Sequence, residues 1–243
     1  MKKTLKRIGY LILSLLVIGC MAFFAWASFG YDADKKVLSN ALKNRDVSIE
    51  NTDEYISVRP FNYKSNKGYI FYPGAKVQPE AYISKLSAIA VSNNIEIFIP
   101  KMYMNLAFFG INKAGEIQKQ FPKIIHWYIG GHSLGGSMAC VYASKNNKTF
   151  DGILIFGTYS GTDISKELTK VRSINGEQDG VFPPEKIKKH KGELPNDAQI
   201  LFVKGMNHAD IGNYGFQSGD NPSKLTNNVV TDELVNATKG FFE

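Results

Sequence analysis

The stretch IIHWYIGGHSLGGSMACVYA, residues 124–143, decides how this chain folds. It begins with Ile124–Ile129, a compact apolar run of the kind that forms a buried strand, and Gly130 and Gly131 follow at once. The residues from Leu134 to Ala143 are mostly small, so a helix formed by them can lie close against a sheet. The stretch therefore predicts a strand, a very tight turn and a helix.

The turn carries Gly131-His132-Ser133-Leu134-Gly135, which matches the pattern G-x-S-x-G. On a sharp strand-to-helix turn, a serine is held in a strained conformation with its hydroxyl exposed, and glycines two positions away remove side chains that would collide. The start of the following helix offers free N–H groups and the positive end of its dipole. We therefore expect Ser133 to be a nucleophile; the alternative is a glycine-rich turn with an idle serine.

The rest of the chain alternates between apolar runs and amphipathic segments. Buried runs that alternate with helices predict an α/β fold, in which a mostly parallel sheet is covered by helices on both faces. The expected strands are Tyr55–Arg59, Gly68–Tyr72, Ile95–Ile99, Ile124–Ile129, Gly152–Phe156, Val171–Asn175 and Gln199–Val203. The expected helices open at Pro79 and cover Asn112–Gln120, Leu134–Ala143, Pro184–Lys189 and Ser223–Phe241.

A serine nucleophile needs a base within hydrogen-bond reach, and in this architecture the chain order is Ser, acid, His. Two histidines follow Ser133. His190 lies in a lysine-rich run that is typical of a solvated helix end, whereas His208 follows the last predicted strand. Loops at the carboxyl ends of parallel strands form the ligand crevice. We therefore predict that His208 is the base.

The acid should follow the strand before that one, where the sequence is Gly176-Glu177-Gln178-Asp179-Gly180. Asp179 is preferred, because a short carboxylate before glycine suits a tight loop that faces the histidine; Glu177 is the rival. Such an acid holds the histidine in one tautomer and stabilises its imidazolium. Three other acids are interpreted as strand-start, loop and turn residues: Asp151, Asp163 and Asp210.

Acyl transfer also needs N–H donors for the oxyanion. The backbone N–H of Leu134, directly after the nucleophile, is expected to supply one. The second is expected from the loop after Gly68–Tyr72, where Pro73 has no N–H, so Ala75 is preferred over Lys76 and Gly74.

Substrate contacts are predicted from Tyr72, Met102 and Phe108, because all three follow strand ends. Tyr72 is equally explained as the last core aromatic of its strand, and the run Met102–Phe109 can line an acyl pocket or pack under the next helix. The connections between strands are short and leave little room for a large lid. We expect an open site and a small or extended substrate.

Three features resemble the α/β-hydrolase superfamily: the sharp turn around Ser133, which we call the elbow, the chain order Ser133, Asp179, His208, and the spacing of these residues after strand ends. FYPGAKV (71–77), PKM (100–102) and NLAF (105–108) are similar to a compact branch of bacterial hydrolases of the fold-five type, and the likeness runs from Gly68 to Phe241. The resemblance implies hydrolysis of esters or related acyl bonds. Many relatives have His-Gly where this chain has Pro73-Gly74, which puts the second oxyanion donor in doubt.

The first thirty residues predict a membrane segment. Ile8–Gly30 contains no charged residue and is long enough to cross a bilayer as a helix, and four basic residues precede it. The positive-inside rule then keeps the N-terminus in the cytoplasm and sends residues 31–243, the hydrolase domain, outward. Two alternatives are cleavage near Ala27, which gives a secreted protein, and lipidation at Cys20. All three place the folded part outside the cytoplasmic membrane.

Composition argues against several other classes of protein. The net charge is +7, but four positive charges lie before Ile8, and only four of the 29 basic residues are arginine. Because base readout favours arginine, we expect no nucleic-acid partner. Two cysteines and four scattered histidines predict no metal, and no dinucleotide fingerprint or P-loop implies a cofactor. Cys140, in the small-residue helix, is interpreted as a packing residue.

The sequence thus predicts a membrane-tethered extracytoplasmic serine hydrolase that cleaves an ester through Ser133, His208 and Asp179. The expected partner is a small-molecule or envelope acyl substrate. Peptidase, thioesterase or acyltransferase chemistry on the same triad is one alternative. A catalytically silent binding module with the same fold is another.

Overall fold

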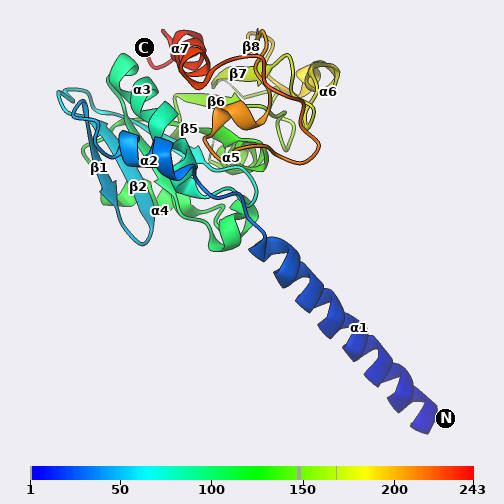
Figure 1. Ribbon diagram of the computed structural model, residues 1–243. Helices are drawn as coiled ribbons and strands as arrows, with labels where there is room; N and C mark the ends of the chain where they lie inside the picture. The colour runs from blue at the N-terminus through cyan, green and yellow to red at the C-terminus, as the bar shows by residue number, and fades with distance from the viewer. Residues whose placement is uncertain (1, 147–148, 168) are drawn as a thin grey trace. The chain divides into compact units, whose positions relative to one another are not determined.

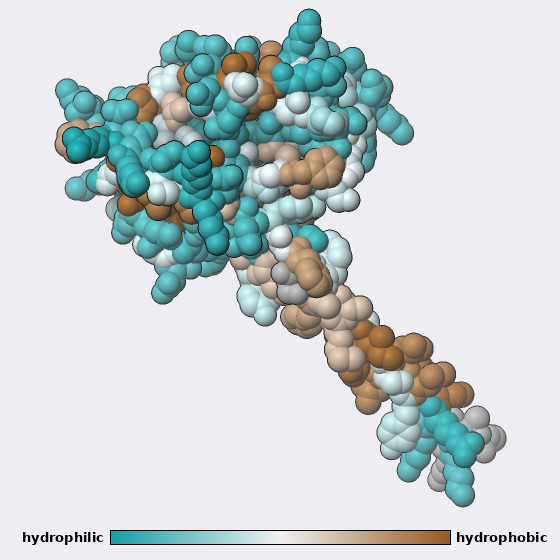
Figure 2. Space-filling model, viewed as in Figure 1, coloured by the Kyte–Doolittle hydropathy of each residue, from teal (hydrophilic) through white to brown (hydrophobic). Residues whose placement is uncertain are grey.

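The computed structural model describes residues 2–146, 149–167 and 169–243 (Figure 1). The chain divides into two compact units, one up to Gly30 and one from Tyr31 to Glu243. The first unit is the helix α1 (Lys2–Ser28). Its apolar stretch Lys6–Ala27 has 22 residues, about 33 Å of helix, which is enough to cross a hydrocarbon core. Figure 2 shows hydrophilic residues near its N-terminal end and apolar residues along the remainder. A signal sequence has the same properties.

The second unit is built on an eight-stranded sheet with the order β1-β2-β4-β3-β5-β6-β7-β8. The strands β3 to β8 run parallel, whereas β2 pairs antiparallel with both β1 and β4. The strands are β1 (Val47–Asn51), β2 (Tyr55–Pro60), β3 (Lys67–Tyr72), β4 (Glu96–Pro100), β5 (His126–His132), β6 (Gly152–Phe156), β7 (Lys170–Gly176) and β8 (Gln199–Val203). The seven predicted strands are present, and the partly exposed edge strand β1 was missed because its run is short and polar.

Helices cover both faces of this sheet, and each face has its own apolar core. One face carries α2 (Lys35–Ala41), α3 (Ile83–Asn93) and α7 (Asn227–Thr238). The other carries α4 (Lys113–Gln120) and α5 (Leu134–Lys145), and α6 (Pro184–Lys189) lies between β7 and β8 in the chain. The predicted α/β architecture with a mostly parallel sheet is therefore confirmed.

The helix at the C-terminus is shorter than predicted. It was expected over Ser223–Phe241, but α7 covers Asn227–Thr238. At its start, the Ser223 hydroxyl bonds Asp210, which keeps that segment in the loop. At its end, Phe241 and the next residue, Phe242, are buried against Tyr128 instead of continuing the helix. Tertiary contacts set both boundaries.

Candidate active site

The turn between β5 and α5 holds Ser133 in a conformation that non-glycine residues rarely adopt, with φ 54° and ψ −128°. Such a conformation costs about 1–3 kcal/mol and persists where the surroundings determine it. Here the Ser133 N–H donates to the Phe156 carbonyl at 3.0 Å, and the Ser133 carbonyl accepts from Ser137 N at 3.1 Å. The sheet and the helix therefore fix both sides of the serine, which is 9% exposed.

Two glycines of the elbow make room for the end of β3. A Cβ on Gly131, whose φ is +153°, would lie 2.2 Å from the Tyr72 carbonyl oxygen. A Cβ on Gly135 would lie 2.2 Å from the carbonyl oxygens of both Tyr72 and Pro73. The loop after β3 therefore lies directly against the nucleophile turn, as an oxyanion site requires.

Asp179 and His208 are joined by a hydrogen bond of 2.8 Å between Oδ2 and Nδ1. Both side chains are fully buried. The other carboxylate oxygen, Oδ1, accepts the backbone N–H groups of Val181 at 2.9 Å and Phe182 at 2.6 Å. An ionised carboxylate only accepts, so Nδ1 of His208 is the donor and its Nε2 is left as the basic nitrogen.

The Nε2 atom of His208 is buried and has no hydrogen-bond partner within the described part of the chain. The structure thus brings Asp179 and His208 together but forms no hydrogen bond from His208 to Ser133. The two residues share neighbours. Phe182 stacks on the His208 ring at 5.6 Å and also lines the cavity beside Ser133, and the ring of His132, the residue before Ser133, lies 4.4 Å from that of His208. Catalytic hydrogen bonds often close only when substrate binds.

A second carboxylate, that of Asp220, braces the histidine loop. It accepts the backbone N–H groups of His208 at 3.2 Å, Ala209 at 2.9 Å and Gly180 at 3.0 Å. It therefore ties the loop after β8 to the loop that carries Asp179. Sequence reasoning missed Asp220, because an aspartate in a Gly-Asp-Asn-Pro run is typical of any turn.

The residue before the nucleophile, His132, belongs to a buried polar chain. Its Nδ1 lies 2.9 Å from the Tyr82 hydroxyl, which in turn accepts the Gly74 backbone N–H at 3.0 Å. Burial, with the neighbouring His208 as a second cause, holds the pKa of His132 well below its usual range, so this ring is neutral. These hydrogen bonds from His132 through Tyr82 to Gly74 link the elbow to the loop after β3. It was also missed, because the x of G-x-S-x-G carries no required residue type.

The N–H groups near the elbow separate into used and unused donors. In the loop after β3, Gly74 N donates to Tyr82, Lys76 N donates to the Asn105 carbonyl at 2.7 Å, and Pro73 has no N–H. Among the hydrogen bonds of the described residues, none uses the N–H of Ala75. Leu134 is the first residue of α5, where an N–H has no partner within the helix.

A cavity of about 440 Å³ opens beside Ser133, and its lining is of mixed polarity. Hydroxyl groups, two carboxylates and two aromatic rings surround it. Besides Ser133 and Leu134, its lining residues are Ser137, Tyr159, Ser160, Gly161, Thr162, Asp163, Phe182 and Glu193. From the sequence, Asp163 was interpreted only as a loop residue, and none of the others was predicted to line a cavity. Most of these side chains come from loops, and the sequence does not predict the path of a loop.

A family model described as the alpha/beta hydrolase family matches residues 68–232. The chain belongs to this family. Among curated proteins, none matches the chain in sequence.

Solved structures share the fold of this alpha/beta hydrolase at low sequence identity. A predicted CIB-like hydrolase from Thermoplasma acidophilum is 15% identical with a TM-score of 0.58, over 80% of this chain and 97% of that one. The structure of EstE5 soaked with p-nitrophenyl butyrate is 12% identical with a TM-score of 0.59, over 86% and 88%. An arylesterase is 12% identical with a TM-score of 0.58, over 86% and 91%. These likenesses show the fold.

The three residues predicted to contact substrate do not line the cavity beside Ser133. Tyr72 is fully buried, and its hydroxyl donates to the Ile111 carbonyl at 2.6 Å and accepts from Ala114 N at 3.2 Å, as in its alternative interpretation as a core aromatic. Met102 is buried with its sulfur against Gly110. Phe108 is 44% exposed and contacts Phe109. Besides the elbow and α5, the loops that follow β6 and β7 supply the lining.

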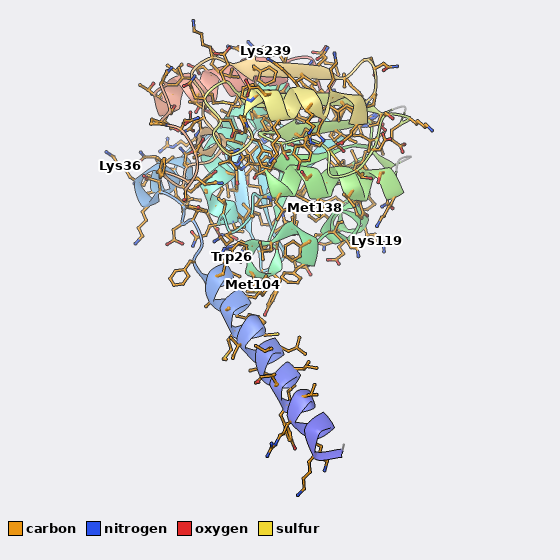
Figure 3. The ribbon with its side chains drawn as sticks, turned by 90° about the vertical axis from the view of Figure 1, so that its right-hand side faces the viewer. Trp26, Lys36, Met104, Lys119, Met138 and Lys239 are labelled. Carbon is orange, nitrogen blue, oxygen red and sulfur yellow. The ribbon has the colours of Figure 1, made fainter. Side chains whose placement is uncertain are left out.

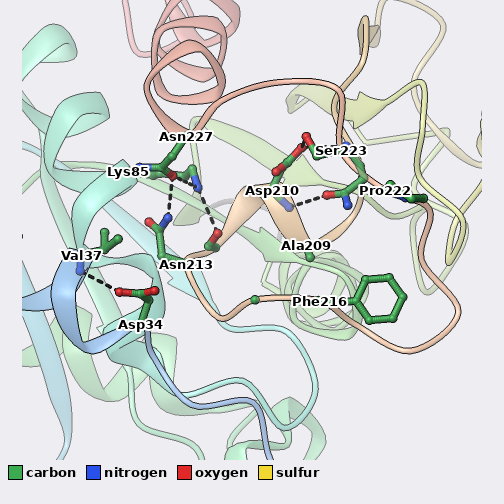
Figure 4. Close-up of a pocket in the computed structure, with 13 residues that line it drawn as sticks. Asp34, Val37, Lys85, Ala209, Asp210, Asn213, Phe216, Pro222, Ser223 and Asn227 are labelled. Carbon is green, nitrogen blue, oxygen red and sulfur yellow. Dashed lines mark hydrogen bonds between the residues drawn. The ribbon is translucent and has the colours of Figure 1, made fainter.

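A second cavity, of about 390 Å³, is lined partly by the loop that follows His208 (Figure 4). Lys85 of α3 is buried and donates to the Gly212 carbonyl at 3.0 Å and to Asn227 Oδ1 at 2.9 Å. Burial lowers the pKa of Lys85 to about 8. In the same cavity, Asp210 accepts from the Ser223 hydroxyl and from Asn207 N. These contacts brace the loop, so Asp210 has a structural role here.

No cluster of three or more potential metal ligands occurs among the described residues. Cys140 is fully buried in α5, and burial raises the pKa of its thiol to about 12. A protonated thiol in this position is a packing group, because the thiolate is the nucleophilic form.

Proposed function

We propose that this alpha/beta hydrolase cleaves an ester through Ser133, His208 and Asp179. The observation that carries the proposal is the buried Asp179–His208 pair, whose free Nε2 lies at the same edge of the sheet as the strained serine. A buried imidazole with one nitrogen tied to a carboxylate and the other unpartnered is suited to accept a proton.

In the proposed reaction, Ser133 Oγ attacks the acyl carbon while His208 Nε2 takes the hydroxyl proton. The oxyanion accepts hydrogen bonds from the backbone N–H groups of Leu134 and Ala75. As the C–O bond breaks, Nε2 returns the proton to the leaving alcohol, and Ser133 carries the acyl group. Water then attacks with the same help from His208, and the acid is released. Asp179 stays ionised and stabilises the imidazolium throughout.

The cavity supports a small-molecule ester as the substrate. Its volume of about 440 Å³ lies within the usual range for small-molecule sites. Its wall combines aromatic rings with hydroxyl groups and carboxylates, so it can accommodate both the apolar and the polar parts of an ester. An ester is favoured over an amide because an alcohol leaves more easily than an amine.

The proposal includes a tether. We place residues 1–30 in the membrane as an anchor with the N-terminus in the cytoplasm, and residues 31–243 outside it as the hydrolase domain. The exposed apolar stretch Lys6–Ala27 and the basic residues before Ile8 support this orientation. Cleavage near Ala27 or lipidation of Cys20 would still leave the enzyme outside the cytoplasm, as a secreted or lipid-anchored form.

The full chain in detergent, incubated with a fluorophosphonate probe and with p-nitrophenyl butyrate, tests the triad. We expect the wild type to be labelled and active, and Ser133→Ala to lose labelling and at least about 10³-fold in rate. Ser144→Ala, in the same helix, is the matched control and should behave as the wild type. Equal labelling of Ser133→Ala and the wild type would remove Ser133 from the mechanism. A folded wild type that resists labelling would favour a silent binding module.

A further inference from the structure

The segment Tyr103–Phe109, which we call the aromatic loop, exposes three rings after the end of β4. Tyr103 is 67% exposed, Phe108 44% and Phe109 48%. The rings contact one another, with Phe108 and Phe109 at 4.4 Å and Tyr103 and Phe109 at 5.9 Å. Exposed aromatic clusters of this kind mark interaction surfaces.

The backbone of the aromatic loop is held firmly while its rings face outward. Leu106 and Ala107 are fully buried and fix its centre in the protein. Met104 and Asn105 adopt positive φ values of 54° and 52°, which non-glycine residues rarely accept. Figure 3 shows Met104 at the surface of the folded unit. The buried centre of the loop thus anchors it, while the three rings on either side remain exposed.

Two hydrogen bonds connect the aromatic loop to the residue at which the folded unit begins. Lys76 N donates to the Asn105 carbonyl at 2.7 Å, and Tyr31 N donates to the Lys76 carbonyl at 2.7 Å. Tyr31 also forms a parallel bridge with Val77. The aromatic loop and the start of the folded unit therefore lie together, at the carboxyl edge of the sheet.

Covalent geometry then limits how far this edge can lie from the membrane. Phe29 and Gly30 are the residues between the end of α1 at Ser28 and Tyr31. Three extended links span at most about 11 Å. If α1 crosses the bilayer, Tyr31 lies within this distance of the end of the helix, close to the headgroup layer, where tyrosine and other aromatic rings are favoured.

The charge of the surrounding sequence suits the same partner. Lys101 precedes the aromatic loop, and Lys113 follows it and pairs with Glu116 at 3.0 Å. Basic residues next to exposed aromatic rings are attracted to anionic lipid headgroups.

We propose that the aromatic loop inserts its rings into the lipid interface of the membrane that holds α1. The carboxyl edge of the sheet, with Ser133 and His208, then faces the bilayer. The substrate is accordingly an ester presented at the membrane surface. This inference rests on the proposed tether and triad.

Fluorescence quenching by brominated lipid tests the contact. The full chain carrying Trp26→Phe is reconstituted in vesicles of phosphatidylethanolamine and phosphatidylglycerol, with Trp127, which is buried, as the background signal. Phe108→Trp is the reporter. Phe61→Trp is the matched control, because Phe61 is 77% exposed and follows β2, which runs antiparallel and so ends at the opposite edge. We expect acyl-brominated lipid to reduce the reporter signal at least about twofold and to leave the control unchanged.

The outcomes separate the loop from the tether and the triad. A chain that floats with the vesicles but whose reporter is quenched no more than the control overturns the loop contact alone. A chain that does not float overturns the tether and the contact with it. If the reporter fluorescence changes with the amount of protein per vesicle and not with brominated lipid, the aromatic loop contacts a second copy of the protein. That result also overturns the proposal.

Activity provides an independent measurement. We expect Tyr103→Ser to cleave soluble p-nitrophenyl butyrate as the wild type does, and to cleave a long-chain methylumbelliferyl ester held in the vesicles about fivefold more slowly. Equal rates on the vesicle substrate would contradict an interfacial site. If the wild type cleaves neither ester, the triad proposal itself fails.

Discussion

The two halves of the candidate active site are organised in opposite ways. In the acid–histidine half, the carboxylates of Asp179 and Asp220 are saturated with hydrogen bonds, six of them from backbone N–H groups. In the nucleophile half, Ser133 is held in a strained conformation, and the N–H groups of Leu134 and Ala75 face no partner among the described residues.

Under the proposed mechanism, the difference follows from when each half is needed. A base must hold one tautomer before substrate arrives, so its orienting bonds are complete in the resting protein. Oxyanion donors must bind a charge that exists only during the reaction, so in the resting protein they stay unpaired. The site is therefore assembled from one half that is already satisfied and one that substrate completes.

The largest effect is expected from Asp179→Asn in the saturated half. The amide preserves the shape but presents an N–H toward His208 Nδ1, which favours the wrong tautomer, so kcat for p-nitrophenyl butyrate should fall about 10⁴-fold. Glu177→Gln is the matched control, because Glu177 is exposed in the same loop, and it should retain the wild-type rate. The reverse pattern would make Glu177 the acid.

Removing one donor from the unsatisfied half should have the next largest effect. Replacing Ala75 by lactic acid changes its amide N–H to an ester oxygen and keeps the side chain. We expect kcat to fall about 10²–10³-fold with little change in KM, since the lost hydrogen bond forms only in the transition state. A rate within twofold of the wild type would show that another N–H group is the second oxyanion donor. It would also contradict the contrast between a satisfied and an unsatisfied half of the site.

A smaller effect is expected from Asp220→Asn, which removes one of the acceptors that hold the histidine loop. Ala209 N would lose its carboxylate partner, so the free energy of unfolding should fall by about 1–3 kcal/mol and kcat by about tenfold. Urea unfolding and steady-state kinetics measure the two. Asp197→Asn, at an exposed position, is the control and should change neither. A loss of stability with full activity would limit Asp220 to folding.

The smallest effect concerns His132, whose hydrogen bonds through Tyr82 to Gly74 lie within the nucleophile half. Its pKa is lowered in the folded state, so the unfolded chain binds a proton that the folded protein excludes as the pH falls below 6.5. Stability is therefore complete above pH 6.5 and falls below it, by at most about 1.4 kcal/mol per pH unit. Urea unfolding between pH 5 and 8 measures this slope.

The control for this slope is the exposed His126. We expect the pH dependence to flatten in His132→Asn and to persist in His126→Gln, because the His126 side chain is half exposed. An unchanged slope in His132→Asn would show that another group causes it.

Local sequence predicted the parts of this site that depend on the order of elements. Ser133 was predicted as the nucleophile from a strand, a pair of glycines and a helix, and Asp179 and His208 were predicted from their positions after successive strands. The structure joins the last two. Asp220 and Tyr82 could not be found in this way, because each acts on a loop far along the chain, where neither spacing nor periodicity records the contact.

By itself, the sequence determined the alternation of strands and helices, the elbow and the apolar N-terminal segment, because these depend on periodicity, glycine geometry and hydrophobic length, which are local properties. Tertiary structure alone decided which side chains line the cavity. It buried Tyr72 in the core, turned the aromatic loop outward and brought Tyr159 and Phe182 beside Ser133. These outcomes depend on packing between loops, and a residue's neighbours in space are set by the whole fold.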